Sequence, residues 1–355
     1  MSGVSIKAAV LQRLGEPLAI ITGIEQPPLK PGQVLVRMAC SGVCHSQLME
    51  VRGRRGADPY LPHLLGHEGS GVVVAIGSDV AKVSVGQAVV LTWIRGDGCE
   101  AGGSQFHCDE VTLNAGGVTT FNDYAVVSEN RVVPLPEGVP MDVAALLGCA
   151  VPTGAGLVLN QLLPEPGDAV AVFGIGGIGA SALMAITALG CRRIIAVDVS
   201  ADKLQLARKL GATDCIDARA GDPVAAIRAL TDGHGVDRAF DASGRAPVIE
   251  QAFAATRRGG LCLFASHPAA GERISIDPYE LICGKRIQGS WGGGTQPDRD
   301  IPRFAALYRE GRLPLELLLT RRYELDEINE ALDDLEAGRT LRPIIVFDHD
   351  LANRR

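Results

Sequence analysis

The feature that most constrains the fold of this chain is a glycine-rich turn, Gly174-Ile175-Gly176-Gly177-Ile178-Gly179, which fits the pattern G-x-G-x-x-G. An apolar run, residues 168–174, leads into the turn, and an apolar stretch rich in alanine and isoleucine, residues 176–189, leads out of it. Asp198 closes the next apolar run, residues 194–198. A strand, a glycine turn, a helix and an acid in this order predict a dinucleotide-binding βαβ unit.

Each glycine has a physical task in such a unit. Gly174 permits the tight turn, Gly176 lets the backbone approach a pyrophosphate, and Gly179 lets the helix pack closely on the strand. The helix that begins at Gly176 and Gly177 offers unpaired N–H groups and a partial positive charge to the phosphates.

Asp198 predicts which dinucleotide binds. Its carboxylate would accept hydrogen bonds from the adenosine ribose hydroxyls and repel a 2′-phosphate, which favours NAD over NADP. Lys203 either lies beside this ribose or is an ordinary solvated helix lysine. The structural alternative is a glycine turn with Asp198 as a capping residue that binds nothing.

The sequence pattern changes near residue 153. The first 150 residues hold short β-type runs between glycines and prolines, which predict a small antiparallel barrel or sandwich. From about residue 153 strands alternate with helices, which predicts a parallel sheet. After residue 294 this alternation breaks down into a helix, a loop and a last strand. The middle block therefore looks inserted, with one domain from residues 1–152 and 293–355 and another from residues 153–292. The expected strands are residues 6–11, 34–38, 71–76, 88–92, 168–174, 194–198, 238–242, 261–264 and 344–347, with a further helix at 201–212.

Composition excludes several classes of protein. The 355 residues carry 34 Lys and Arg against 41 Asp and Glu, without a basic block, so we expect no nucleic-acid partner. We also expect no membrane span and a cytoplasmic location, because there is no apolar run of about 20 residues and no secretory signal. The nine cysteines are odd in number and scattered, which does not suggest a disulfide framework.

Three short segments place soft or imidazole ligands beside glycine: Gly42-Val43-Cys44-His45-Ser46, Gly66-His67-Glu68-Gly69 and Leu147-Gly148-Cys149-Ala150. Two cysteines and one histidine form a known catalytic zinc set that leaves a fourth position open. Two thiolates and a neutral imidazole cancel the charge of the ion, so a neutral alcohol could bind and lose its proton easily. Each residue alone is more often core packing. Together with the dinucleotide turn, they predict redox chemistry between an alcohol and a carbonyl compound.

These segments, the nucleotide motif and the late turn Gly338-Arg339-Thr340-Leu341-Arg342 together resemble the zinc-dependent alcohol dehydrogenases of the medium-chain dehydrogenase/reductase superfamily, over nearly the whole chain. The resemblance implies an α/β protein with a GroES-like, β-rich catalytic domain from both chain ends and a Rossmann domain for NAD between them. It also implies one catalytic zinc ion per chain, a small alcohol or carbonyl substrate, and a homodimer or homotetramer.

Carried over position by position, the resemblance assigns these roles: zinc ligation to Cys44, His67 and Cys149, a carboxylate near the metal to Glu68, uptake of the substrate proton to Ser46, pyrophosphate contacts to His45 and Arg342, and a wall of the substrate pocket to Trp93.

The chain departs from the family pattern at two positions after Ser46. Gln47 stands where an aspartate usually hydrogen-bonds the ligand histidine, and an amide should raise the ring's basicity less. Met49 stands where many relatives have a proton-carrying histidine. The proton relay would then end at Ser46, a ribose hydroxyl and ordered water, with His45 as a further candidate.

A third departure concerns residues 96–120, which lack the usual four cysteines of a structural zinc site. We expect this loop to be held by packing without metal. The alternative is an improvised site from Cys99, His107 and Cys108.

The leading hypothesis is thus an NAD-dependent zinc alcohol dehydrogenase. The alternatives are the same chemistry on a specialised substrate (a thiol–aldehyde adduct, an aryl alcohol or a cyclitol) and a non-catalytic NAD-binding protein.

Overall fold

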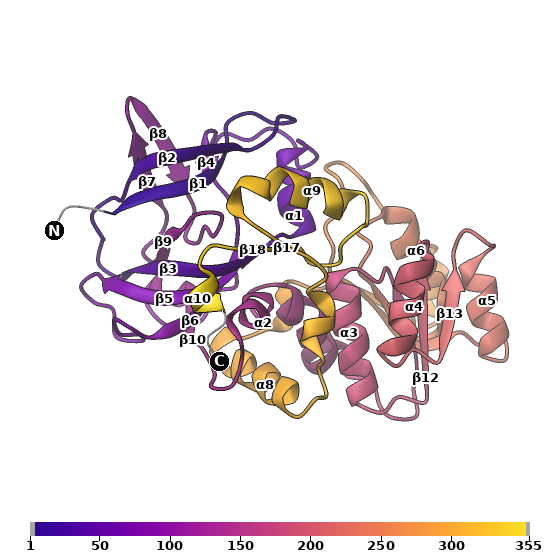
Figure 1. The fold of residues 1–355 in the computed structure, drawn as a ribbon. Helices are drawn as coiled ribbons and strands as arrows, with labels where there is room; N and C mark the ends of the chain where they lie inside the picture. Colours follow the sequence, from indigo (N-terminus) through magenta and orange to yellow (C-terminus); the bar gives the residue numbers. More distant parts are fainter. Residues whose placement is uncertain (1–3, 353–355) are drawn as a thin grey trace. The chain divides into compact units, whose positions relative to one another are not determined.

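The computed structural model describes residues 4–352, which divide into two compact units (Figure 1). The first unit comprises the chain up to Cys149, Gln296–Arg309 and the chain from Leu315 onward. The second comprises Ala150–Thr295 and Glu310–Pro314. The first is rich in β-strands and the second holds a parallel sheet, so the predicted fold class is confirmed.

The first unit contains a closed barrel and a second sheet. The barrel order is β1-β2-β7-β8-β4, and the sheet order is β10-β6-β5-β3-β18-β17, with β9 paired to β3. The barrel strands are β1 (Ser5–Leu11), β2 (Ala19–Glu25), β4 (His63–Leu64), β7 (Ser104–Cys108) and β8 (Val111–Ala115). The sheet strands are β3 (Gln33–Gly42), β5 (Glu68–Ile76), β6 (Ala88–Thr92), β9 (Tyr124–Ser128), β10 (Val132–Pro134), β17 (Arg322–Tyr323) and β18 (Ile344–Val346). The predicted small antiparallel barrel is present, although β4 pairs with β8 in parallel.

The C-terminal segment completes this first unit. Strand β18 pairs antiparallel with β3, with Ile344 opposite Gly42. Helix α9 (Ile328–Glu336), yellow in Figure 1, lies beside the indigo helix α1 (His45–Val51). Buried apolar residues from both chain ends form one core, which includes Leu11, Val43, Leu48, Ile328 and Ile345. Residues 323–345 therefore pack directly on the elements that carry the first ligand segment. The unit's other helices are α2 (Met141–Leu146), α8 (Pro297–Arg309) and α10 (His349–Ala352).

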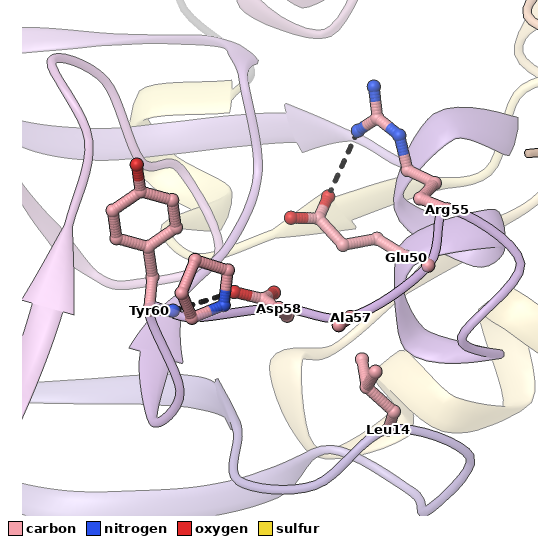
Figure 2. Close-up of a pocket in the computed structure, with 8 residues that line it drawn as sticks. Leu14, Glu50, Arg55, Ala57, Asp58 and Tyr60 are labelled. Carbon is pink, nitrogen blue, oxygen red and sulfur yellow. Dashed lines mark hydrogen bonds and ion pairs between the residues drawn. The ribbon is translucent and has the colours of Figure 1, made fainter.

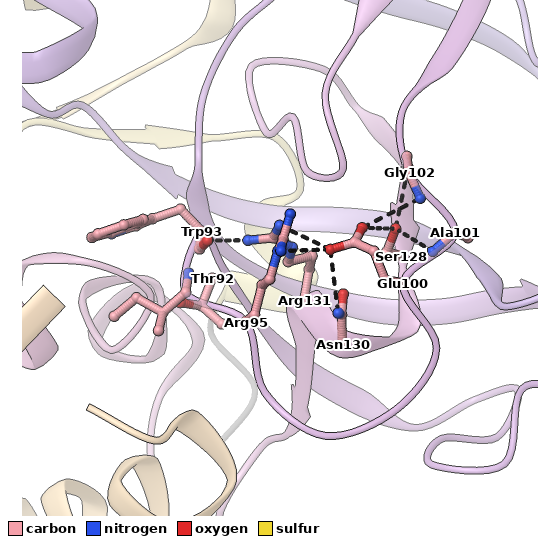
Figure 3. A network of polar contacts seen from close by, with 10 residues as sticks. Thr92, Trp93, Arg95, Glu100, Ala101, Gly102, Ser128, Asn130 and Arg131 are labelled. Atoms are coloured by element: carbon pink, nitrogen blue, oxygen red, sulfur yellow. Dashed lines mark hydrogen bonds and ion pairs between the residues drawn. The ribbon is translucent and has the colours of Figure 1, made fainter. Parts of the chain in front are cut away.

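Polar contacts hold the loop for which no metal was expected (Figure 3). The Glu100 carboxylate accepts from Arg95 Nε at 2.8 Å, and it is also paired with Arg131. The Glu129 carboxylate accepts from the backbone N–H groups of Ala81, Lys82 and Cys99 at 2.6–2.8 Å.

The three candidate ligands of an improvised site do not come together in this loop. Cys99 Sγ lies 3.6 Å from the backbone oxygen of Asp79, whereas Cys108 Sγ lies 3.8 Å from that of Thr22. Among residues 4–352, Cys99, His107 and Cys108 do not form a cluster whose ligand atoms lie within 4.8 Å of one another.

The second unit is built on a six-stranded sheet in the order β13-β12-β11-β14-β15-β16, with every neighbouring pair parallel. The order reverses at β11, so a ligand crevice is expected beyond the carboxyl end of this strand. The strands are β11 (Ala169–Phe173), β12 (Arg193–Asp198), β13 (Asp214–Asp217), β14 (Val236–Asp241), β15 (Thr256–Phe264) and β16 (Arg286–Gly289). The helices are α3 (Gly177–Ala188), α4 (Ala201–Lys209), α5 (Pro223–Leu230), α6 (Ala246–Ala255) and α7 (Pro278–Ile282), with π-helical turns at Pro152–Gly156 and Val158–Leu162.

Membrane crossing was not expected from the sequence. Among residues 4–352, no helix combines the length and the apolar character that crossing a bilayer requires.

Candidate active site

Three predicted zinc ligands converge in the first unit. Cys44 follows β3 and caps the N-terminus of α1, His67 directly precedes β5, and Cys149 follows α2. Because β3 and β5 pair antiparallel, with Ser41 opposite Gly69, the end of one strand meets the start of the other. The ligand atoms of the three residues lie within 4.8 Å of one another, and His67 Nε2 is 3.2 Å from Cys149 Sγ.

This donor set fits a catalytic zinc ion. Two buried sulfurs and one imidazole nitrogen are three ligands of the kind that leave a fourth position for a substrate oxygen. Ser46 lies two residues after Cys44, and its hydroxyl oxygen is buried without a hydrogen-bond partner among residues 4–352. A buried hydroxyl without a partner is able to accept a hydrogen bond or a proton from a bound ligand.

The two thiols share one hydrogen bond. A bond from the Cys149 thiol, together with the charge of nearby Arg342, holds the pKa of Cys44 well below its usual value despite burial. The same bond and burial raise the pKa of Cys149 well above its usual value.

Two glycines make room for the buried carboxylate of Glu68. A Cβ added to Gly42 would lie 2.2 Å from Glu68 Oε1, and one added to Gly148 would lie 2.8 Å from Glu68 Cβ and 2.2 Å from the backbone oxygen of Leu91. The sequence placed both glycines beside candidate ligands, but a chain with 43 glycines gives no signal for which of them must leave room for a packed side chain.

Arg342 reaches this carboxylate from the far end of the chain. The backbone oxygen of Pro343 accepts from Val43 N at 2.9 Å, which places Arg342 beside the turn that holds Cys44. Its guanidinium, only 4% exposed, is ion-paired with Glu68. Burial opposes the charge of Arg342, but Cys44, Glu68 and Cys149 together raise its pKa above the usual value. The residue assigned to the pyrophosphate thus contacts the groups around the candidate metal site.

His67 contacts two further residues of interest. Gln47 hydrogen-bonds to its Nδ1, which confirms the predicted contact between the amide and the ring. The Trp93 ring lies edge-on to the imidazole, with ring centroids 6.4 Å apart and an angle of 68° between the planes. Arg131 donates a hydrogen bond to the backbone oxygen of Trp93 and is paired with Glu100, so the loop network reaches this aromatic ring (Figure 3).

The remaining residues of the ligand segment lie on α1. His45 is exposed at the first position of this helix, whereas Met49 is buried in its middle. A buried thioether cannot carry a proton, as the sequence indicated.

The glycine turn in the second unit has the predicted conformation. Gly174 has a φ of +85°, and a Cβ on Gly179 would lie 1.9 Å from the Gly174 backbone oxygen. A Cβ on Gly176, the N-cap of α3, would meet no atom within 4 Å. Gly177 begins the helix. The turn therefore packs tightly at its two ends and is open in the middle, where a pyrophosphate would approach.

Asp198 lies against this turn at the end of β12. One carboxylate oxygen accepts from Ile175 N at 2.7 Å, and the other accepts from Ser200 N at 2.9 Å. The Asp198 carboxylate therefore links the glycine turn to the start of α4, which is the capping role named as the alternative to ribose binding. Its remaining lone pairs can still accept hydrogen bonds from ribose hydroxyls. Lys203 is half-buried in the first turn of α4. Sequence reasoning missed Thr153, whose buried hydroxyl has no hydrogen-bond partner among residues 4–352.

A second group of possible ligands lies beside a small cavity of about 180 Å³ in the first unit (Figure 2). His63, for which the sequence offered no role, accepts or donates at Nε2 to Asp58 Oδ2 at 2.9 Å and lies 3.9 Å from Glu50 Oε1. Its Nδ1 lies 3.0 Å from the backbone oxygen of Leu64, and Arg55 is paired with Glu50. These polar groups thus satisfy one another and tie the loop after α1 to β4.

Comparisons with known proteins cover both units. Residues 30–137 match the family described as alcohol dehydrogenase GroES-like domain, and residues 177–309 match the family described as zinc-binding dehydrogenase. Geraniol dehydrogenase of Castellaniella defragrans is 35% identical, covering 97% of this chain and 98% of that protein. S-(hydroxymethyl)glutathione dehydrogenase of Synechocystis is 32% identical, covering 96% and 99%.

Solved structures agree with this comparison. Benzyl alcohol dehydrogenase from Acinetobacter calcoaceticus superposes with a TM-score of 0.87 at 33% identity, covering 97% of this chain and all of that one. A zinc-binding-domain alcohol dehydrogenase protein from Burkholderia ambifaria gives 0.89 at 32% identity, covering 98% and 100%. With relatives of this identity along its full length, the chain belongs to the zinc-type alcohol dehydrogenases of the medium-chain dehydrogenase/reductase superfamily.

Proposed function

We propose that this protein is a zinc-dependent alcohol dehydrogenase that transfers hydride between a primary alcohol and NAD, reversibly. The observation that carries the proposal is the convergence of Cys44, His67 and Cys149 within 4.8 Å, beside the buried hydroxyl of Ser46 that has no partner among residues 4–352. A zinc ion held by these three residues would act as a Lewis acid on the oxygen of the alcohol.

The chain's own residues would then move the proton and shape the pocket. Ser46 Oγ has lone pairs that can accept the alcohol proton, and among residues 4–352 it has no hydrogen-bond partner that competes for them. Met49 cannot pass this proton on, so Ser46 would hold the proton at its Oγ. Trp93, fixed by Arg131 at its backbone and edge-on to His67, supplies an apolar wall.

The choice of NAD is supported by the second unit. Gly176 leaves open space at the N-terminus of α3, where a pyrophosphate would receive N–H groups. The Asp198 carboxylate, 8% exposed, would accept ribose hydroxyls and repel a 2′-phosphate, and Lys203 lies one turn into the next helix. NAD, when bound, accepts the hydride.

The names of two relatives support a class of substrate. Geraniol and benzyl alcohol are both primary alcohols whose carbon adjoins an unsaturated carbon, and the Trp93 ring suits such a flat, apolar group. The relative that acts on S-(hydroxymethyl)glutathione favours a second candidate, a thiol–aldehyde adduct.

All nine cysteines lie within residues 4–352 and none forms a disulfide, which supports the reducing cytoplasm as the setting.

The test uses the purified full chain. We expect about one zinc ion per chain and reduction of NAD with benzyl alcohol or geraniol. The panel also includes glutathione with formaldehyde and a cyclitol. If one of these is the preferred substrate, the proposed substrate class is wrong but the proposed alcohol oxidation stands. Ser46→Ala should keep its zinc and lose about a hundredfold or more in kcat, because proton transfer by a positioned group contributes at least about this much. A zinc-loaded protein that binds NADH but oxidises no alcohol of the panel would overturn the proposal.

A further inference from the structure

The buried carboxylate of Asp334, on α9, binds groups from two segments that flank Arg342 in the fold. Asp334 is 4% exposed. Its Oδ2 accepts hydrogen bonds from Arg321 Nη1 at 2.6 Å and from the Tyr323 hydroxyl at 2.5 Å. Its Oδ1 accepts from Arg339 Nε at 2.6 Å, and its backbone oxygen accepts from Arg339 N at 2.9 Å. The Tyr323 hydrogen bond and the contacts with Arg339 lower the pKa of Asp334, so its carboxylate is charged at neutral pH.

These partners hold the backbone on both sides of Arg342. Arg339 lies three residues before Arg342 in the chain. The backbone oxygen of Arg321 accepts from Ile344 N at 3.2 Å, two residues after Arg342, and β17 pairs in parallel with β18 from there on. Asp334 therefore holds the chain before Arg342 through Arg339 and the chain after it through Arg321.

The guanidinium of Arg342 has a donor left for a second anion. Its Nε is buried without a hydrogen-bond partner among residues 4–352, although the guanidinium is also paired with Glu68. A buried N–H without a partner costs free energy, which a bound anion would recover. Because the five N–H donors of a guanidinium lie in one fixed plane, it meets an anion well only in the correct orientation. The orientation of Arg342 therefore decides how well it can bind the pyrophosphate that the family resemblance assigns to it.

We infer that Asp334 is a positioning residue for the cofactor, because it orients the segment of Arg342 so that the guanidinium donates to the pyrophosphate of NAD. Asp334 acts through its two arginine partners, without touching the cofactor itself. The inference rests on the proposed function, namely on the binding of NAD, and on the pyrophosphate contact of Arg342.

The experiment compares two fragments of the cofactor on the full chain. ADP-ribose contains the pyrophosphate and adenosine lacks it, and the dissociation constant of each is measured by displacement of NADH, whose fluorescence reports binding. In Asp334→Asn, we expect ADP-ribose to bind about tenfold more weakly, because a displaced guanidinium loses about one charge-assisted hydrogen bond. Adenosine binding should not change. The matched control is Asp333→Asn, which removes an exposed acid of the same helix that is paired with Arg52, and both constants should stay as in the parent.

A double variant shows whether Asp334 acts through Arg342. Arg342→Met should weaken ADP-ribose binding about 10- to 100-fold, and adding Asp334→Asn should weaken it no further. Additive losses in the double variant would overturn the inference. Equal losses for ADP-ribose and adenosine in Asp334→Asn would overturn it too, since they indicate a general loosening of the fold.

Arg339→Met keeps the test open if Asp334→Asn does not fold, because it removes one partner of Asp334 from an exposed position. We expect ADP-ribose binding to weaken in this variant as well, by less than in Asp334→Asn. Arg54→Met, which breaks an exposed pair with Glu336 on the same helix, is its control and should change nothing. Thermal unfolding of each variant checks that the fold is kept.

The remaining outcomes separate this inference from the proposed function. Unchanged ADP-ribose binding in Asp334→Asn, or in Arg339→Met where Asp334→Asn does not fold, overturns the inference alone. Unchanged ADP-ribose binding in Arg342→Met removes the pyrophosphate contact, and the inference with it, but leaves the proposed alcohol oxidation standing. A parent protein that binds no NADH overturns the proposed function as well.

Discussion

The guanidinium of Arg342 is paired with the carboxylate of Glu68, and the two side chains are 4% and 0% exposed. Neither charge can turn to water if the other is removed. Because Arg342 also lies near the thiols of Cys44 and Cys149, it is the positive charge that balances several acidic groups.

We therefore expect Arg342→Met to lower the free energy of unfolding by about 3–5 kcal/mol, since it leaves a buried carboxylate without its partner. Urea unfolding of the zinc-free protein measures this loss. Lys7→Met, which breaks the exposed pair with Asp326, is the control and should cost less than about 1 kcal/mol. Adding Glu68→Gln to Arg342→Met should restore about 1–3 kcal/mol. Equal losses for Arg342→Met and Lys7→Met would contradict the enclosed pair.

Close packing around Glu68 gives a second prediction. Gly148→Ala would place a Cβ 2.2 Å from the Leu91 backbone oxygen, so the segment before Cys149 must move. We expect a loss of about 1–3 kcal/mol in stability and weaker zinc retention. In the exposed control Gly116→Ala, the nearest atom lies 3.9 Å away, and both properties should be unchanged. Unaltered zinc retention in Gly148→Ala would count against this packing.

The contacts of Arg131 with Trp93 and Glu100 predict an effect on substrate binding. Arg131→Met removes the hydrogen bond to the Trp93 backbone oxygen and the pairing with Glu100. Trp93 should then be held less firmly, and KM for an aromatic alcohol should rise by up to about tenfold, or about 1.4 kcal/mol. Zinc content and kcat should stay near those of the parent. Arg95→Met removes only the exposed partner of Glu100 and is the matched control. A fall in kcat without a change in KM would show that Arg131 does not act through the pocket wall.

Cofactor choice can be tested at Asp198. Asp198→Asn removes the negative charge but keeps an acceptor for a backbone N–H, so the turn at Ile175 should persist. We expect the ratio of kcat/KM for NAD to that for NADP to fall by about tenfold or more, because repulsion of the 2′-phosphate is lost. Asp202→Asn, on the exposed side of the same helix start, should leave this ratio unchanged. An unchanged ratio in Asp198→Asn would mean that another group selects the cofactor.

Local patterns predicted most strands of the parallel sheet but only β1 of the barrel. The expected strands at residues 88–92 and 194–198 appear as β6 and β12 almost residue for residue, because apolar runs end there at turn residues. The expected helix at 176–189 appears as α3. The following strands were not among the expected ones: β2, β4, β7, β8, β9, β10, β13, β16 and β17. Of these, β13 is only half-buried and β17 has two residues, so pairing with neighbouring strands defines them.

The individual candidate ligands could be named from sequence, but their surroundings could not. The pairing of Glu68 with Arg342 depends on β18 joining β3, a contact between residues just over 300 positions apart. The contact between Gln47 and His67 depends equally on where His67 lies after folding. The spacing of these residues along the chain does not show that either pair lies close together.

The addition of β18 to β3 has a consequence for biosynthesis. Ile344 and Pro343 bond to the turn that leads into Cys44, and they are synthesised about 300 residues after that turn. Until then, Cys44, Cys149 and the carboxylate of Glu68 lack Arg342, the cation that balances their charge in the folded protein. The packing around Cys44 and Glu68 should therefore form only after β18 has been synthesised, although Cys44, His67 and Cys149 are all made long before it.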